Sequence, residues 1–84
     1  MKTIYMLIEA AWCAWEYSDE EVIALSEDKE LLEEIAAGLY TVAVKQYKND
    51  DVDVETNDDD LIIKRGKKGY DEGKQYFVVP EILL

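Results

Sequence analysis

The chain has 84 residues, of which 49% are hydrophobic and 11% aromatic, so it is predicted to form one folded domain, residues 1–84. Its 20 acidic and 9 basic residues give a net charge of −11, which argues against direct nucleic-acid binding because that requires a basic surface. It contains no histidine, which excludes His-based catalysis and histidine metal sites, and we predict a non-enzymatic protein without a cofactor or bound metal.

The N-terminal half is predicted to begin with two strands. Residues 2–15 are rich in apolar and aromatic residues, which favours a first strand, and the polar run 16–21 is predicted to turn the chain. Residues 21–26 then return as an antiparallel second strand. The lone Cys13 is expected to be a buried or half-buried apolar residue of the first strand. Glu9 interrupts the only signal-like apolar run and no segment reaches the roughly 20 apolar residues of a membrane span, so we expect a cytoplasmic protein without membrane contact.

A long helix is predicted to follow the two strands. Ser26 is expected to cap its N-terminus, because a serine oxygen accepts hydrogen bonds from the first backbone N–H groups. Apolar residues spaced three and four apart predict that the helix packs on the sheet through Leu31, Leu32, Ile35, Leu39, Val42 and Ala43. The same spacing continues through Gly38, which extends the helix to about Tyr47. An alternative ends the helix at Gly38 in a left-handed cap and makes residues 39–47 a strand.

The remaining residues are predicted to be strands. Residues 51–55 alternate valine with acid, as in a solvent-facing edge strand, and residues 61–65 and 74–79 are strands joined by the glycine-rich loop 66–73. Pro80 cannot donate to a ladder, so the last strand is expected to lie at an edge or to end there. The elements predict an α+β fold: an antiparallel sheet, ordered ββα followed by two or three strands, with one long helix on one face. Its core is predicted to contain Leu7, Val22, Ile23, Leu32, Ile35, Leu39, Ile62 and Phe77.

The acidic residues concentrate in two segments. Residues 16–34 hold nine acids and one lysine, and residues 49–60 hold seven acids and no base. Carboxylates repeat about every 5–6 Å on a helix and about every 6.7 Å on a strand, so two such rows can present a phosphate-like field to a basic cleft. The alternative is an acidic surface that serves only solubility. The predicted partner-binding arms are Asp51, Asp53, Glu55, Asp58, Asp59 and Asp60 on one side, and Glu27, Glu30, Glu33 and Glu34 on the outer face of the helix.

A second face of the predicted helix carries no charge. Ala37 and Thr41 lie on it between larger apolar residues, and the end of the first strand is also rich in aromatic residues. Since aromatic residues are enriched at interface hot spots, we predict a homodimer that uses one of these two surfaces. The alternative is that residues 77–84 cover the helix face within one chain. The predicted apolar interface residues are Tyr40, Val44 and Tyr47 on the helix, and Trp12 and Trp15 on the strand.

Two loops lack the spacing of known ligand-binding motifs. In the acidic segment, an EF-hand register that starts at Asp51 places Thr56 and Ile62 where the motif needs glycine and glutamate. The sequence GKKG at residues 66–69 lacks the spacing of a phosphate-binding P-loop. Two alternative functions stay open: a regulatory domain that binds a cation or small ligand, and a structural subunit of a larger complex.

The strand KTIYMLIEA, the return strand VIALS and the capped helix SEDKELLEEI, in a short acidic chain, resemble small proteins of phages and mobile elements. The acidic members of that group include anti-restriction and anti-CRISPR inhibitors, several of which are DNA mimics. This resemblance implies a bacterial partner that binds or processes nucleic acid, and it assigns no individual residue. We therefore expect an acidic inhibitor or adaptor that occupies the basic site of such a protein.

Overall fold

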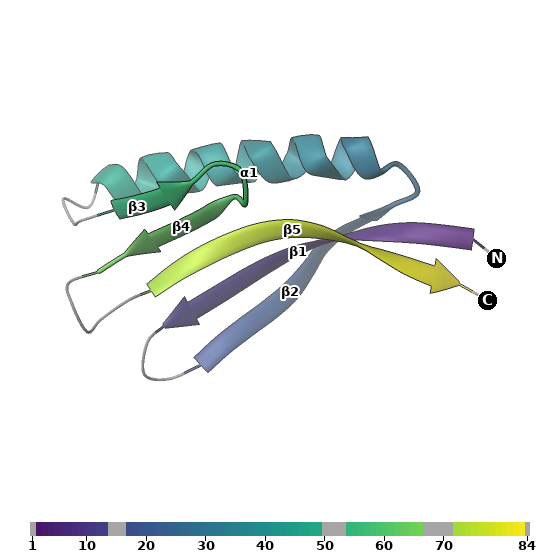
Figure 1. Cartoon of the computed structure of the whole chain (residues 1–84), viewed down its shortest axis with the longest axis horizontal. Helices are drawn as coiled ribbons and strands as arrows, with labels where there is room; N and C mark the ends of the chain where they lie inside the picture. Colours follow the sequence, from purple (N-terminus) through teal and green to yellow (C-terminus); the bar gives the residue numbers. More distant parts are fainter. Residues whose placement is uncertain (1, 14–16, 50–53, 67–71, 84) are drawn as a thin grey trace.

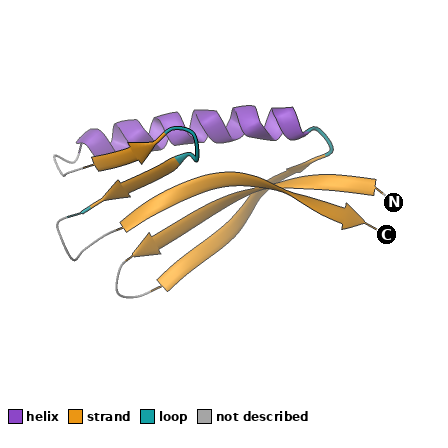
Figure 2. Ribbon diagram, in the orientation of Figure 1, coloured by secondary structure: helices purple, strands orange, loops and turns teal. Residues whose placement is uncertain are grey.

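The computed structural model describes residues 2–13, 17–49, 54–66 and 72–83. Within these residues, all strand pairs are antiparallel and form one five-stranded sheet in the order β2-β1-β5-β4-β3, with a single long helix packed against it (Figures 1 and 2). The predicted α+β class is therefore confirmed. The elements are β1 (Lys2–Cys13), β2 (Tyr17–Ser26), α1 (Lys29–Asn49), β3 (Val54–Asn57), β4 (Ile62–Arg65) and β5 (Glu72–Leu83).

β1 and β2 form an antiparallel hairpin at one side of the sheet. β1 ends at Cys13, earlier than predicted, and residues 14–16 lie outside the described residues. β2 includes the polar residues 17–21 that were predicted to turn, because at an edge strand acidic side chains stay in solvent while their backbone pairs with β1. Cys13 is exposed at the end of β1, so the prediction that it is buried or half-buried was wrong.

The start of α1 differs from the prediction by two residues. Asp28, rather than Ser26, caps the helix, because Asp28 Oδ1 accepts a hydrogen bond from the Leu31 N–H at 3.2 Å. Ser26 Oγ instead accepts from the Asp28 N–H at 3.0 Å, which holds the residues just before the helix. The helix continues through Gly38, so the alternative that ended it there was wrong.

The face of α1 that packs on the sheet is rotated from the predicted face by roughly 80°, somewhat less than one residue step. Leu32 is buried as predicted, but Leu31, Ile35 and Val42 are 45%, 37% and 55% exposed. The predicted phase was wrong because these large aliphatic side chains were favoured over smaller ones. Ala43 is also buried as predicted, and Leu39 packs against the core. Ala36 and Tyr40 replace the three exposed residues on the buried face, with Val44 and Tyr47 packed beside them.

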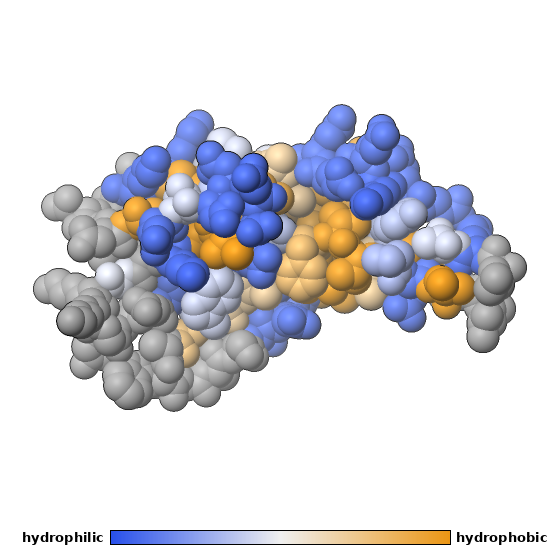
Figure 3. Space-filling view, in the orientation of Figure 1, coloured by the Kyte–Doolittle hydropathy of each residue, from blue (hydrophilic) through white to orange (hydrophobic). Residues whose placement is uncertain are grey.

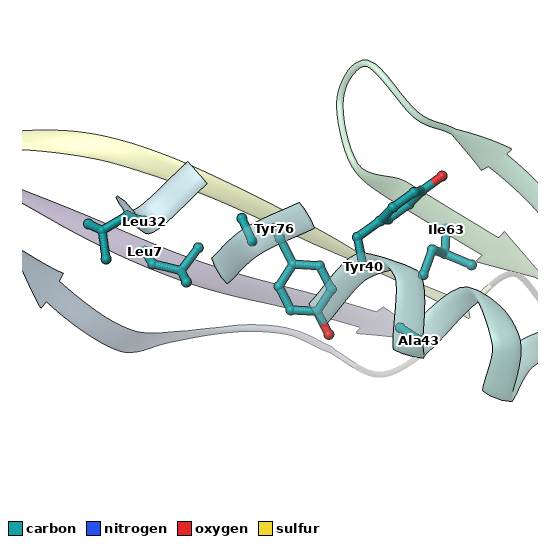
Figure 4. Packing of buried hydrophobic residues seen from close by; sticks show 7 residues of the cluster. Leu7, Leu32, Tyr40, Ala43, Ile63 and Tyr76 are labelled. Carbon is teal, nitrogen blue, oxygen red and sulfur yellow. The ribbon is translucent and has the colours of Figure 1, made fainter. Parts of the chain in front are cut away.

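The core lies between α1 and the sheet face that carries Leu7, Ile63 and Tyr76 (Figure 4). Leu7 is fully buried, which confirms that part of the predicted core. Val22 and Ile23 are 50% and 41% exposed, so their assignment to the core was wrong: β2 is an edge strand with no neighbour on its outer side. Two more predicted core residues are only half-buried, and they lie on the sheet face away from the helix: Ile62 and Phe77.

β5 continues through Pro80. The sequence predicted that the last strand would end at Pro80 or lie at an edge of the sheet. The Tyr76 N–H donates a hydrogen bond at 3.3 Å to the Leu61 carbonyl, on the β4 side. Backbone groups alternate sides along a strand, so Pro80, four residues on, also directs its backbone groups to that side. There β4 has already ended, and the missing N–H of Pro80 removes no bond to β1.

Candidate functional site

The acidic residues of α1 lie in solvent, on the sides of the helix away from the buried stripe. Glu30, Glu33 and Glu34 are all exposed, as the sequence predicts for an outer face. Glu27 precedes the helix rather than lying on it, and its carboxylate pairs with Lys2 Nζ at 2.5 Å. Glu33 pairs with Lys29 Nζ at 3.7 Å, one helical turn away. Exposed pairs of this kind contribute less than about 1 kcal/mol, so these carboxylates stay accessible to a partner.

The second acidic segment is a tight turn between β3 and β4 that is organised by Asn57. Asn57 Oδ1 accepts hydrogen bonds from the backbone N–H groups of Asp59 and Asp60, at 3.1 and 3.2 Å, and Asn57 Nδ2 donates to Asp60 Oδ2 at 3.2 Å. Leu61 completes the turn with a left-handed backbone, φ 53°. These bonds leave the Asp59 carboxylate exposed at the tip of the turn.

Tyr40 joins this turn to the helix. Its hydroxyl donates a hydrogen bond to Asp58 Oδ1 at 2.5 Å, and Figure 4 shows its ring reaching from α1 toward the β3–β4 turn. Burial, and then the hydrogen bond to Asp58, raise the pKa of the Tyr40 hydroxyl above its usual value. The side chain is only 6% exposed, so its assignment to an outer dimer interface was wrong.

Val44 and Tyr47 were also predicted to form an outer apolar face, and that prediction was wrong for the same reason. Both side chains are half-buried and pack against the core cluster beneath the helix. The rotated phase of α1 turns this face toward the sheet of its own chain. Tyr76 and Val78 of β5 pack against this helix face. This arrangement is close to the alternative in which residues 77–84 cover the helix face within one chain.

The two acidic segments meet at one groove, which we call the α1–turn groove. Glu33 from the helix and Asp59 from the turn lie on its rim, together with Lys29. Its volume is about 450 Å³, and Figure 3 shows hydrophobic residues below the hydrophilic surface of α1, over the middle of β5. The sequence assigned Phe77 to the core and Ala37 to the uncharged helix face, but it did not identify a groove between them. The apolar residues that line the groove are Ala36, Ala37, Leu61, Tyr76, Phe77 and Val78.

Glu55 does not join this groove. It stands opposite Lys64 in the β3–β4 register, and both lie on the sheet face opposite the one that carries Val54 and Ile63. The predicted row of carboxylates along this strand is therefore only partly described, since Asp51 and Asp53 lie outside the described residues. The described part of the second arm consists of Glu55 on β3 and the turn acids Asp58, Asp59 and Asp60.

Trp12 is half-buried rather than free for a partner. It stands directly opposite Gly73 on β5, and its indole covers that glycine so closely that a Cβ there would collide with the ring. Gly73 was predicted to belong to a flexible loop, but it is a buried residue of β5. Trp15 lies outside the described residues.

Comparisons with known proteins do not assign this site. No protein-family model matches the chain, and no curated protein or solved structure is significantly similar to it. Among the described residues, no helix has the length and apolar character needed to cross a membrane. Within the same residues, no group of three or more acidic or cysteine side chains is arranged to hold a metal ion.

Proposed function

We propose that this chain is a non-enzymatic, acidic protein-binding inhibitor or adaptor that occupies the basic, nucleic-acid-binding surface of a bacterial protein inside the cell. The observation that carries the proposal is the α1–turn groove, where Glu33 and Asp59 lie on one rim although they are distant in sequence. Their carboxylates flank an apolar floor, so a partner can place a basic side chain at the rim and an apolar one between them.

The charge around the groove supports an electrostatic mode of capture. Glu30, Glu34 and Asp59 are exposed and form no ion pair with any described cation. Their negative charge is therefore available to attract a basic partner. Complementary charge raises encounter rates and is screened beyond a Debye length of about 8 Å at physiological ionic strength. Binding is therefore expected to be fast and to weaken as salt is added. A partner that normally binds phosphates should also be displaced from the chain by DNA.

The test is capture of proteins from a bacterial lysate on the immobilised chain, with elution either by salt or by double-stranded DNA, followed by mass spectrometry. The site variant changes Glu33→Gln, Glu34→Gln and Asp59→Asn. Asp58 and Asp60 are left intact because they accept hydrogen bonds from Tyr40 and Asn57, so neutralising the whole turn would also disturb the fold.

The matched control removes the same number of charges from the exposed edge strand β2, with Asp19→Asn, Glu20→Gln and Glu21→Gln. Exposed charge pairs contribute about 0.2–1 kcal/mol each, so the site variant should bind a captured partner roughly 3- to 100-fold more weakly, and the control should not. The proposal fails if both variants lose affinity equally, or if DNA does not compete for the captured protein.

A further inference from the structure

The face of the sheet away from α1 carries a second, uncharged surface. Leu7 faces the helix, so its neighbours Met6 and Ile8 face the other way, because side chains alternate along a strand. Residues directly opposite each other share a face, which aligns two rows across β2, β1 and β5. We call this surface the open sheet face, and its two central rows are Leu25–Met6–Val79 and Val22–Ile8–Phe77.

These two rows contain six apolar side chains and no charged one. Ile8, on β1 between β2 and β5, is 9% exposed, whereas Val22 and Leu25 on the edge strand β2 are 50% and 63% exposed. The charged residues that the structure describes on this face lie outside the two rows: among them, Glu20 stands opposite Ala10, Glu81 opposite Ile4, and Glu55 opposite Lys64 on β3 and β4. An apolar centre with a charged rim is the arrangement of a protein–protein interface.

The chain exposes more surface than a compact monomer of its mass. Its accessible surface is 6153 Å² for 9.7 kDa, whereas folded monomers of that mass expose about 5,100 Å². The Cα radius of gyration is 14.2 Å, against about 12 Å for a compact domain of this length. The excess of about 1,000 Å² is comparable to the roughly 800 Å² that each partner buries in a standard interface.

We propose that a second copy of this chain covers the open sheet face, in a two-fold symmetric dimer with the two sheets packed face to face. Such a dimer uses the same patch on both copies, so an uncharged apolar surface is complementary to itself. The acidic helices then lie on the two outer sides, separated by both sheets. Stacked sheets are about 10 Å apart, so the helices lie beyond the Debye length of about 8 Å and repel only weakly.

This arrangement goes beyond the proposed function and does not depend on it. Phe77 borders both the open sheet face and the α1–turn groove, but the acidic rim of the groove, Glu33 and Asp59, comes from α1 and the β3–β4 turn. Both copies therefore keep that rim exposed in the dimer. The dimer would therefore present two acidic surfaces that face in opposite directions. The row Ala10–Gln75 flanks the two central rows, and Trp12 and Gly73 form the row after it. Trp12 and Gly73 therefore lie at the border of the dimer interface rather than at its centre.

The test is the molar mass of the full chain in solution, measured by sedimentation equilibrium over a range of concentrations. The wild-type chain is expected to have twice the mass of its 9.7 kDa monomer. Leu25→Glu adds one charge to the open sheet face of each copy, so the dimer interface would contain two buried charges. This variant should be a monomer with an unchanged circular dichroism spectrum. Leu31→Glu is the matched control, because Leu31 is 45% exposed on α1 and the substitution makes the same change in net charge.

Leu25→Thr provides a second variant that keeps strand preference, in case the glutamate unfolds β2, and it should raise the dimer dissociation constant at least about tenfold. Two results would overturn the proposal. One is a wild-type chain that stays monomeric at several hundred micromolar. The other is dissociation by Leu31→Glu but not by either Leu25 variant, which would place the interface on the helix.

Discussion

An alanine side chain would have free space at Gly38 but would collide with neighbouring atoms at Gly73. The same Gly→Ala substitution is therefore expected to have opposite effects on stability at the two positions. A Cβ at Gly38 has nothing within 4 Å, so Gly38→Ala should stabilise the fold by about 0.5–1 kcal/mol through helix preference. A Cβ at Gly73 would collide with Trp12 and lie 2.5 Å from the Ile63 carbonyl oxygen, so Gly73→Ala should destabilise it by about 1–3 kcal/mol. Thermal melting of both variants checks the prediction, and shifts in the same direction would contradict it.

The buried Tyr76 hydroxyl is expected to make the free energy of unfolding depend on pH in the alkaline range. Its side chain is 4% exposed, and burial, followed by a hydrogen bond to Glu9, raises the pKa of its hydroxyl. Because the folded-state pKa lies above the unfolded value of about 10, its contribution is complete below pH 10 and is lost as pH rises above it. The free energy of unfolding should fall by about 1.4 kcal/mol per pH unit for this one proton.

Urea unfolding between pH 8 and pH 11 measures this dependence. Tyr76→Phe removes the titrating group and should reduce the slope above pH 10. Tyr40, whose pKa is raised in the same direction, should account for part of the remaining slope. If Tyr76→Phe and the wild type lose stability in parallel, Tyr76 keeps its ordinary pKa and the prediction is wrong.

At the scale of the element, the phase of α1 can be tested with two adjacent leucines. Leu32 is 1% exposed beneath the helix, and Leu31 is 45% exposed beside it. Leu32→Ala should therefore cost about 2–5 kcal/mol by leaving a cavity, whereas Leu31→Ala should cost less than about 1 kcal/mol. Chemical denaturation of the two variants decides between the observed phase and the predicted one. Equal losses would mean that both leucines are packed.

At the scale of the whole molecule, the net charge of −11 predicts that salt stabilises the fold. Like charges repel across a small protein, and this repulsion is screened as the Debye length falls from about 30 Å at 0.01 M to about 3 Å at 1 M. The melting temperature should therefore rise by a few degrees between low and moderate NaCl.

The same experiment tests the alternative of a cation-binding domain. CaCl₂ or MgCl₂ at an ionic strength matched to NaCl should shift the melting temperature no further if only screening acts. A much larger shift at micromolar Ca²⁺ would indicate specific binding, because a ligand stabilises the folded state according to its concentration relative to its dissociation constant. That outcome would favour a regulatory cation site over the acidic binding surface.

Much of the fold could be read from local patterns in the sequence. The spacing of apolar residues through Gly38 predicted a long helix, and the apolar and aromatic content of the first strand predicted β1. The clustering of acids predicted exposed carboxylates at Glu30, Glu33 and Asp59. These features depend on neighbours in the chain, so periodicity and composition are enough to find them.

The tertiary structure alone decided which helix face is buried and which acids meet. Ala36 and Ala43 face the sheet because they leave room for the Tyr76 ring, and Tyr40 can be buried because Asp58 accepts its hydroxyl. In the same way, Glu33 and Asp59 share a groove only after the β3–β4 turn docks on α1. Each outcome depends on contacts between residues far apart in the sequence, and the spacing of residues within one element carries no information about them.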